Sequence, residues 1–385
     1  MQETRMLSES SYQAARSVAA TVERHFAHHH ASALLSGERD LAPLPHQRAI
    51  ETIIDVAFWA SLRREEGYSP KISLAFLPLK TAHQPLSFAY RLPLTPAILT
   101  KLAPAVERPG IHLGVWHEDD QYYIWGTTQD IPTNCFVLEV IEPGLLVIKH
   151  RRMGGFGKFV NVAILKGDQI KVVDDRTGEK PDCPELLNSM LGFTSPAYWN
   201  NSLNVMVQLA VSMRAHGRGG LLLVVPAGSR TWPESIIQPM TYAVEPAFSL
   251  LADLLRRKPA EKAGSEWRGA LSMAVEGVAG LTAVDGATLI NHQYELLGFG
   301  AKIGRSLRST PVEQIVVTEP IVGNVPLVIH PTQAGGTRHL SAAQFVFDQR
   351  DATALVASQD GRFTIFAWSD AEGMVHAHRV DSLLL

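Results

Sequence analysis

Two short segments near the carboxyl end of the chain carry residue types that can handle a nucleotide. The run Gly335-Gly336-Thr337-Arg338-His339 puts a hydroxyl, a guanidinium and an imidazole directly after two glycines, whose backbone N–H groups can approach a ligand closely. The segment Asp285-Gly286-Ala287 offers one carboxylate. We expect it at the end of an apolar strand, where it can hold a divalent metal and activate a hydroxyl. Together the two segments predict phosphate chemistry.

The overall composition limits the classes of protein to which the chain can belong. It has 385 residues, of which 46% are hydrophobic, enough for two packed cores. A formal net charge of −3 gives no broad positive surface, so binding to nucleic acid is not expected. No apolar run reaches the roughly 18 residues that span a bilayer, and the polar start does not resemble a signal peptide.

The cysteines point to a reducing compartment. Cys135 and Cys183 lie far apart in the sequence, with no Cys or His ligand spacing around them. This pattern favours neither a disulfide framework nor a structural zinc site. We therefore expect a cytoplasmic protein with no membrane partner.

Helical and strand patterns in the first half of the chain predict an α+β domain at residues 36–180. Helical spacing of apolar residues indicates a leader helix within residues 1–35 and a second helix at Gln47–Arg64. Residues 181–200 are rich in polar residues, Pro and Gly, which predicts a linker or a loosely packed helix. The predicted strands are Ile72–Ala75, His112–Trp116, Tyr122–Trp125, Cys135–Ile141, Leu145–His150, Phe159–Leu165 and Gln169–Val173.

Two segments of this half have a second interpretation. The cluster His28-His29-His30 can recruit a metal, but a solvated helix end explains it better, since no carboxylate or cysteine stands at a ligand spacing. The glycine-rich run 154–158 can be mistaken for a phosphate loop, yet it lacks the spacing and the final Ser or Thr of that motif. A glycine-rich connection between strands is the favoured interpretation.

Residues 201–375 alternate between strands and helices, which predicts a mixed sheet with helices on both faces. The run Leu221–Pro226 is apolar at every position, as expected for a central strand covered on both faces. The chain is thus predicted to be a two-domain protein of the α+β and α/β classes. Other predicted helices are Leu203–Arg214, Ala247–Arg257, Glu266–Leu281 and Ala342–Gln349, and other predicted strands are Leu289–Ile290, Leu296–Phe299, Ala354–Ser358 and Phe363–Ala367.

The order of four motifs in the second half resembles that of a diadenylate cyclase domain, over roughly residues 200–370. The motifs are Gly220-Leu221-Leu222-Leu223-Val224-Val225, Asp285-Gly286-Ala287, Gly336-Thr337-Arg338-His339 with Ser341-Ala342-Ala343, and Ser358-Gln359-Asp360-Gly361. The first half resembles the predicted sensor module that precedes the cyclase domain in some members of that family. This second resemblance rests on the runs 136–144 and 154–159.

The resemblance implies an enzyme that condenses two ATP molecules into cyclic di-AMP and releases pyrophosphate. Two catalytic domains would face each other, so it implies a homodimer or a higher homo-oligomer. Asp285 would be the catalytic carboxylate and would hold Mg²⁺ or Mn²⁺, with Asp360 as a second metal ligand. The ATP would be bound by Gly286 and Ala287 on one side and by Gly335, Gly336, Thr337, Arg338 and His339 on the other.

Two positions differ from the family pattern. Leu340 stands where a second Arg commonly follows the His, and Gln359 stands where a Glu commonly follows the Ser. These differences motivate an alternative, a cyclase-like sensor that binds a nucleotide or cyclic dinucleotide without turnover. A third hypothesis is an interaction scaffold with no nucleotide site.

Three basic residues lie between the Asp285 motif and the Gly335 motif. Lys302, Arg305 and Arg308 can support phosphates, although a solvated basic surface is the favoured interpretation.

Overall fold

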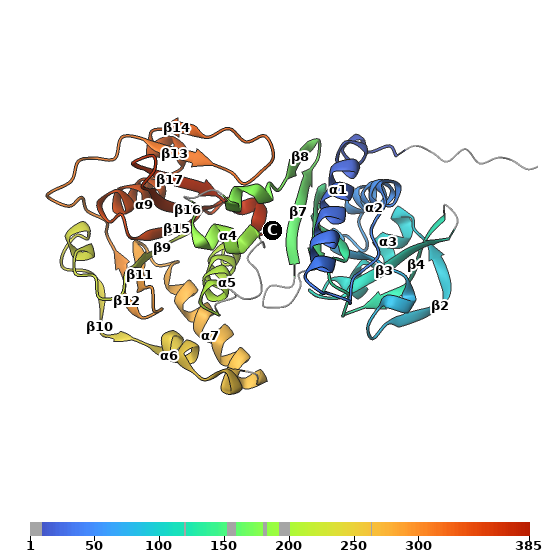
Figure 1. Cartoon of the computed structure of the whole chain (residues 1–385), viewed down its shortest axis with the longest axis horizontal. Helices are drawn as coiled ribbons and strands as arrows, with labels where there is room; N and C mark the ends of the chain where they lie inside the picture. Colours follow the sequence, from blue (N-terminus) through green and yellow to red (C-terminus); the bar gives the residue numbers. More distant parts are fainter. Residues whose placement is uncertain (1–9, 119–120, 152–158, 180–182, 192–200, 263) are drawn as a thin grey trace, which may run out of the picture. The chain divides into compact units, whose positions relative to one another are not determined.

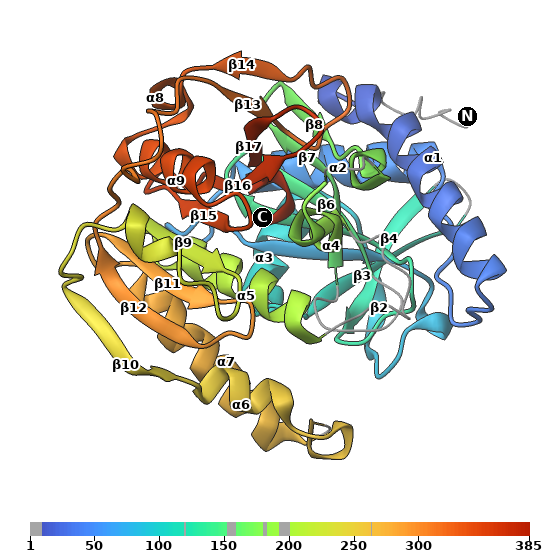
Figure 2. The same cartoon turned by 60° about the vertical axis from the view of Figure 1, so that its left-hand side comes forward.

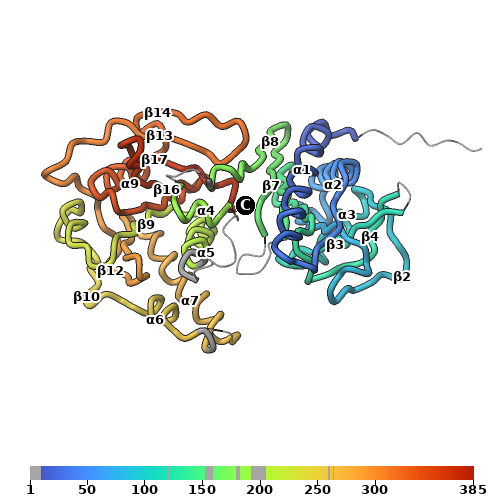
Figure 3. The backbone as a smooth tube through the Cα atoms, viewed as in Figure 1, coloured from blue at the N-terminus to red at the C-terminus, as the bar shows by residue number. Residues whose placement is uncertain are grey.

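The computed structural model describes residues 10–118, 121–151, 159–179, 183–191, 201–262 and 264–385 (Figure 1). They form two compact units, Met1–Val173 with Leu385, and Asp174–Leu384. Figure 3 follows the backbone through both. Each unit contains one mixed sheet and helices, which confirms the predicted two-domain combination of helices and mixed sheets. Among the described residues, no helix has the length and apolar character needed to cross a bilayer.

The first unit is built on an eight-stranded sheet in the order β2-β4-β3-β1-β5-β6-β7-β8. Strands β1 and β3 run parallel, and the other neighbouring pairs are antiparallel. All seven strands predicted from the sequence are present, and the glycine-rich run 154–158 lies outside the described residues. The strands are β1 Ile72–Phe76, β2 Leu86–Pro93, β3 His112–Glu118, β4 Gln121–Thr128, β5 Phe136–Glu142, β6 Leu145–Arg151, β7 Phe159–Lys166 and β8 Gln169–Val172.

Helices α1 (Gln13–Leu35) and α2 (Gln47–Ser61) pack against each other and against one face of this sheet. Val22 and Phe26 of α1 are fully buried, as is Ile53 of α2, in a core that they share with Phe76. The predicted leader helix is therefore part of the first unit's core, because its apolar stripe has a sheet to cover.

The sequence did not predict β2 or the short helix α3 (Pro96–Leu102). The large apolar or aromatic residues Leu86, Phe88, Tyr90 and Leu92 alternate with smaller or polar ones along β2. Most of its side chains are exposed, since this strand lies at the edge of the sheet. Alternation is the signal by which a half-buried strand is recognised, so the sequence carried a signal for β2 that the prediction did not use.

The second unit contains a nine-stranded sheet in the order β10-β12-β11-β9-β15-β16-β17-β13-β14. At its centre, β9 runs parallel to β11 and antiparallel to β15, and β11 runs antiparallel to β12. The strands are β9 Gly220–Val225, β10 Tyr242–Phe248, β11 Ala287–Asn291, β12 Leu296–Ala301, β13 Ile315–Thr318, β14 Leu327–Ile329, β15 Thr353–Ala357, β16 Phe363–Ser369 and β17 Met374–Arg379. The helices are α4 Glu185–Leu191, α5 Asn201–Ala215, α6 Leu250–Arg256, α7 Ser265–Leu281, α8 Pro331–Ala334 and α9 Thr337–Asp348.

Helices cover both faces of this sheet (Figure 2). Leu221 and Leu223 of β9 share a core with Phe345 of α9. Leu222 and Val224 point to the opposite face because side chains alternate along a strand. On that side α5 packs against α7 and β15. The prediction that β9 is buried on both faces is confirmed, since all of its residues are buried.

The bounds of the second unit differ from those predicted for the second domain, 201–375. The predicted linker contains α4, whose Leu187 is fully buried and which packs against α5, so residues there join the unit. At the other end, β17 pairs with both β16 and β13 and therefore extends the sheet beyond residue 375. Helix α9 begins at Thr337, five residues before the predicted Ala342.

Candidate functional site

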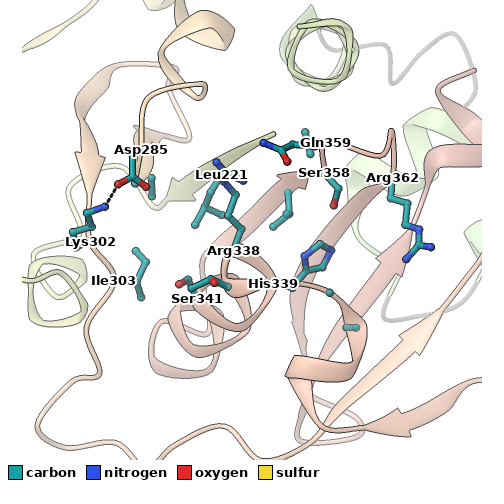
Figure 4. A pocket seen from close by; sticks show the side chains of 18 of the residues that line it. Leu221, Asp285, Lys302, Ile303, Arg338, His339, Ser341, Ser358, Gln359 and Arg362 are labelled. Atoms are coloured by element: carbon teal, nitrogen blue, oxygen red, sulfur yellow. Dashed lines mark hydrogen bonds and ion pairs between the residues drawn. The ribbon is translucent and has the colours of Figure 1, made fainter. Parts of the chain in front are cut away.

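A cavity of about 730 Å³ opens at one end of the central strands of the second unit's sheet (Figure 4). Here β9 and β11 begin and their antiparallel neighbours β15 and β12 end, so segments far apart in the sequence meet. The amino terminus of α9 completes the wall. The cavity is lined by Leu221, Asp285, Gly286, Ala287, Ala301, Lys302, Ile303, Ala334, Gly335, Gly336, Thr337, Arg338, His339, Ser341, Val356, Ala357, Ser358, Gln359, Asp360 and Arg362.

All nine residues that the sequence singles out for the site line this one cavity: Asp285, Gly286, Ala287, Gly335, Gly336, Thr337, Arg338, His339 and Asp360. They come from three separate segments: the turn before β11, the start of α9, and the turn after β15. The structure therefore brings the predicted set together, and the individual roles stay predictions.

Gly336, Thr337 and Arg338 present the amino terminus of α9 to the cavity. Gly336 is the N-cap, and no side chain makes a capping hydrogen bond at this end of the helix. The first amides of a helix have no partner within the helix and attract anions, more so with the helix dipole behind them. The Arg338 guanidinium lies against Gly219, whose φ of +73° and missing side chain leave room for it.

His339 lines the cavity but is only 5% exposed. Its Nε2 lies 3.4 Å from Thr364 Oγ1, and its ring meets Phe366 edge to face. Burial, with the nearby positive charge of Arg379, lowers the pKa of His339 to about 4. The imidazole is therefore neutral at pH 7.

Gly335 is required by its position above this ring. A Cβ at residue 335 would lie 2.4 Å from His339 Nδ1, well inside van der Waals contact. The first glycine of the pair thus lets the turn close over the buried imidazole. The second, Gly336, has open space around it and faces the cavity.

Asp285 extends from the opposite side of the cavity and its side chain is 90% exposed. Its Oδ2 accepts a hydrogen bond from Lys302 Nζ at 2.5 Å, drawn as the dashed line in Figure 4. The Lys302 ammonium, and more weakly the Arg338 guanidinium, hold the pKa of Asp285 below its usual range. The carboxylate is therefore ionised at neutral pH.

The expected place of Asp285 at the end of a strand is wrong. Residues 282–284 continue the turns that end α7, and β11 begins only at Ala287. Asp285 therefore precedes the strand. Because β11 runs antiparallel to β12, this puts it beside Lys302, directly after β12.

Gly286 and Ala287 are small because protein atoms surround them. Gly286 has a φ of +110°, and a Cβ there would lie 2.5 Å from the carbonyl carbon of Gly300. Ala287 is fully buried in the core beneath the cavity. Packing within the protein therefore accounts for the small size of both residues.

Asp360 and Gln359 lie in the turn after β15. Asp360 forms an ion pair with Arg362, Oδ2 to Nε 3.2 Å. Gln359 Nε2 donates to the carbonyl of Arg218 at 3.4 Å. Figure 4 shows Arg362 on one side of the view, Asp285 with Lys302 on the other, and Gln359 between them. Asp285 and Asp360 thus engage different cations, and a metal site shared by the two stays a prediction.

Arg362 is the charged lining residue that the sequence reasoning missed, whereas Lys302 was named there as a residue that can support phosphates. The side chain of Lys302 is 51% exposed, as the favoured interpretation of a solvated basic surface expects, and it also lines the cavity and pairs with Asp285. A signal for that position was available, because Lys302 follows directly on the apolar strand Leu296–Ala301. Arg308 lines a different cavity, of about 560 Å³, and Arg305 is exposed.

Leu340, the first departure from the family pattern, packs against the apolar core of the second unit. It lies on α9 one position after His339, which is on the wall of the cavity. Successive helical residues point about 100° apart, so the side chain at 340 turns away from the ligand side. The apolar residue thus has a packing role at this position.

The donor set fits a hard divalent cation. Asp285 supplies an ionised and exposed carboxylate, and Asp360 a second one in the same cavity. Oxygen ligands of this kind suit Mg²⁺ and Mn²⁺. Lys302 occupies one oxygen of Asp285, so a metal there would compete with the ammonium.

Comparisons with known proteins bear on the first unit. A search of curated proteins found no match to the chain. Residues 39–129 match the model of a protein family described as probable sensor domain DACNV. This range runs from before α2 to the end of β4 and does not include the runs 136–144 and 154–159, on which the sequence comparison relied. Residues 39–129 of the amino-terminal unit are therefore similar to the probable sensor domain DACNV.

Proposed function

We propose that the chain is a diadenylate cyclase, which joins two ATP molecules into cyclic di-AMP, releases pyrophosphate, and is regulated by its amino-terminal sensor domain. One observation carries the proposal: the nine residues assigned from the motif resemblance line a single cavity. A chance likeness of short turns would have no reason to converge in this way. The sensor-domain match at residues 39–129 adds support, because the resemblance pairs such a module with a cyclase domain.

The cavity suits a triphosphate in size and charge. Its volume of about 730 Å³ lies within the range of small-molecule sites. Three cationic side chains line it, Lys302, Arg338 and Arg362, against the carboxylates of Asp285 and Asp360. Arg338 and the first backbone amides of α9 can donate hydrogen bonds into the cavity, where phosphate oxygens would accept them.

Asp285 would hold Mg²⁺ or Mn²⁺, which lowers the pKa of a bound hydroxyl and neutralises phosphate charge. The chain's own groups would do the positioning. Arg338 and the α9 amides would grip phosphate oxygens and keep the α-phosphate in line with the attacking 3′-hydroxyl. Lys302, released from Asp285 when the metal binds, would move its charge onto the phosphates.

The reaction uses two ATP molecules, each attacking the other, so two such cavities would have to face each other. We therefore propose a homodimer or a higher oligomer as the active form. If the dimer is weak, activity per chain rises with protein concentration.

The test is to incubate the protein with ATP and Mn²⁺ and to resolve the products by chromatography. Wild type should form cyclic di-AMP and pyrophosphate, and Asp285→Asn should lose about 100-fold or more of the rate, since one metal ligand and its charge are removed. Asp253→Asn is the matched control, because Asp253 is also exposed and paired with a cation, Arg256, outside the cavity. Equal rates for wild type and Asp285→Asn would refute the assigned mechanism.

The turn after β15 favours a second candidate function, a nucleotide sensor without turnover. Gln359 offers an amide where the family commonly has a carboxylate, and Asp360 is engaged by Arg362. Calorimetric binding of ATP or cyclic di-AMP, with no product after long incubation, would identify this function. If no nucleotide binds or raises the melting temperature, both nucleotide proposals fail and the scaffold hypothesis stands.

A further inference from the structure

Three histidines from distant parts of the sequence come together in the first unit. His25 and His29 lie one turn apart on α1, and His150 lies on β6. The ring centroids are 4.3 Å apart for His25 and His29, 5.1 Å for His29 and His150, and 5.6 Å for His25 and His150. One ring nitrogen of each lies within 4.8 Å of those of the other two. We call this group the histidine cluster.

The packing of α1 on the sheet fixes the position of the cluster. Residues four apart in a helix lie on the same face, which aligns His25 with His29. Phe26, between them in sequence, is fully buried against Phe136, with ring centroids 5.5 Å apart. Phe136 is the register partner of His150 on the neighbouring strand, so the third imidazole lies on the same face of the sheet as this anchor.

The surroundings suit metal ligation. His150 is 8% exposed, and His25 and His29 are half-buried, so the cluster is partly shielded from water. His150 Nδ1 lies 3.3 Å from the carbonyl oxygen of Arg151, to which it can donate. In that tautomer Nε2 carries the lone pair. A carbonyl or carboxylate on the second nitrogen is the usual partner of a metal-binding histidine.

The spacing is close to that of a bound ion. Zn²⁺ binds histidine nitrogens at about 2.0–2.1 Å with tetrahedral geometry, which separates the nitrogens by roughly 3.4 Å. Small side-chain rotations would bring the three imidazoles to that distance. Three neutral nitrogen ligands with one position left for water form a site typical of zinc and similar transition metals.

The three histidines of the run 28–30, which the sequence singled out, do not act as one group in the structure. Only His29 belongs to the cluster, and His28 is exposed. The other two members stand four residues upstream and more than a hundred residues downstream. Within the described ranges, no other three His, Cys, Asp or Glu side chains come this close.

We propose that His25, His29 and His150 bind one divalent transition-metal ion, of which Zn²⁺ is the best fit. This assigns the first unit a ligand site of its own, formed by residues that lie outside the range 39–129 matched by the sensor-domain model. The metal differs in class from the Mg²⁺ or Mn²⁺ proposed for the Asp285 cavity, since imidazole prefers softer ions than carboxylate does. The proposed metal site does not depend on whether the chain has cyclase activity.

The test is metal binding by the full chain. Protein freed of metal by a chelator is titrated with Co²⁺ while the visible ligand-field bands of tetrahedral Co²⁺ are followed, and Zn²⁺ is then added in competition. We expect one equivalent per chain, with Zn²⁺ displacing Co²⁺. His29→Gln should weaken binding by about 100-fold or more, because losing a direct ligand costs at least as much as losing an outer partner.

His28→Gln is the matched control, since it changes a neighbouring histidine of the same helix that lies outside the cluster, and it should bind as wild type does. Asp285→Asn should also leave Co²⁺ binding unchanged. His25→Gln, checked for native helix content by circular dichroism, gives a second ligand variant if His29→Gln disturbs the fold. Absence of binding in wild type, or binding retained in both His25→Gln and His29→Gln, would overturn the proposal.

Discussion

Each unit is a mixed sheet with helices, but the candidate functional residues lie on different kinds of segment in the two units. In the second unit, functional side chains come from turns at the ends of β12 and β15, the turn before β11 and the start of α9. In the first, three histidines project from a helix and a strand that pack together. Turn residues stand together as short motifs, whereas the members of the histidine cluster share no sequence pattern beyond one i, i+4 pair.

Histidine itself behaves differently in the two units. His339 is alone, buried beneath a turn and near the positive charge of Arg379, which keeps it neutral. The imidazoles of the histidine cluster face one another, so each has two nitrogen donors as neighbours. The same residue type therefore supports a backbone turn in one unit and forms a candidate ligand set in the other. The groups that surround each histidine determine which of these two roles it has.

The largest effect that separates the units is expected from Gly286→Ala. The added methyl would meet the Gly300 backbone at 2.5 Å, at a φ of +110° that alanine rarely adopts. We expect a loss of about 3 kcal/mol or more in the stability of the second unit. Hydrogen exchange followed by mass spectrometry should rise in its peptides and stay unchanged in those of the first unit. Gly277→Ala, in α7 with open space around it, should change little or stabilise.

The pH dependence of stability would sharpen the contrast between the histidines. The pKa of His339 is about 4 in the folded chain and 6.5 when unfolded, so the unfolded state binds the proton first as the pH falls. Above pH 6.5 the group has no effect. Between pH 6.5 and 4 it costs stability, up to roughly 3 kcal/mol. His339→Gln should have a shallower fall of unfolding free energy over this window, whereas exposed His292→Gln should follow wild type.

A smaller effect is expected on nucleotide affinity. Arg338→Ala removes a charged donor at the start of α9 and should weaken ATP binding by about 10- to 100-fold in calorimetry. Arg305→Ala removes the same charge from an exposed position outside the cavity lining and should bind ATP as wild type does. Equal loss in both variants would mean that net charge, and not the cavity, holds the nucleotide.

The smallest effect concerns the ion pair within the cavity. Lys302→Met should raise the pKa of Asp285 toward its ordinary value, because the hydrogen bond and charge of Lys302 are the main causes of its lowering. Carbon NMR of the Asp285 carboxyl group during an acid titration would measure this. Arg308→Met, in a different cavity, should leave the titration unchanged. An unshifted Asp285 in Lys302→Met would show that the pair does not persist in solution.

The sequence alone predicted the fold class and most of the elements of both units. Apolar periodicity marked the helices from Gln13 to Ser61 and the buried strands, because burial leaves a repeating trace along the chain. It missed the edge strands β2, β10 and β14 as well as β13 and β17, and it placed Asp285 after a strand when the residue precedes one. The residues of the candidate cavity were identified because each group of them is contiguous, and because the order of these groups resembles that of the motifs in a diadenylate cyclase domain.

Only the tertiary structure decided which of those residues act on one another. The pairing of Asp285 with Lys302 depends on strand register, and the neutral state of His339 depends on burial. The meeting of His29 with His150 follows from how α1 packs on its sheet. Local sequence determines local conformation through steric and apolar patterns, but distances between remote side chains are fixed by packing, and no periodicity in the chain records them.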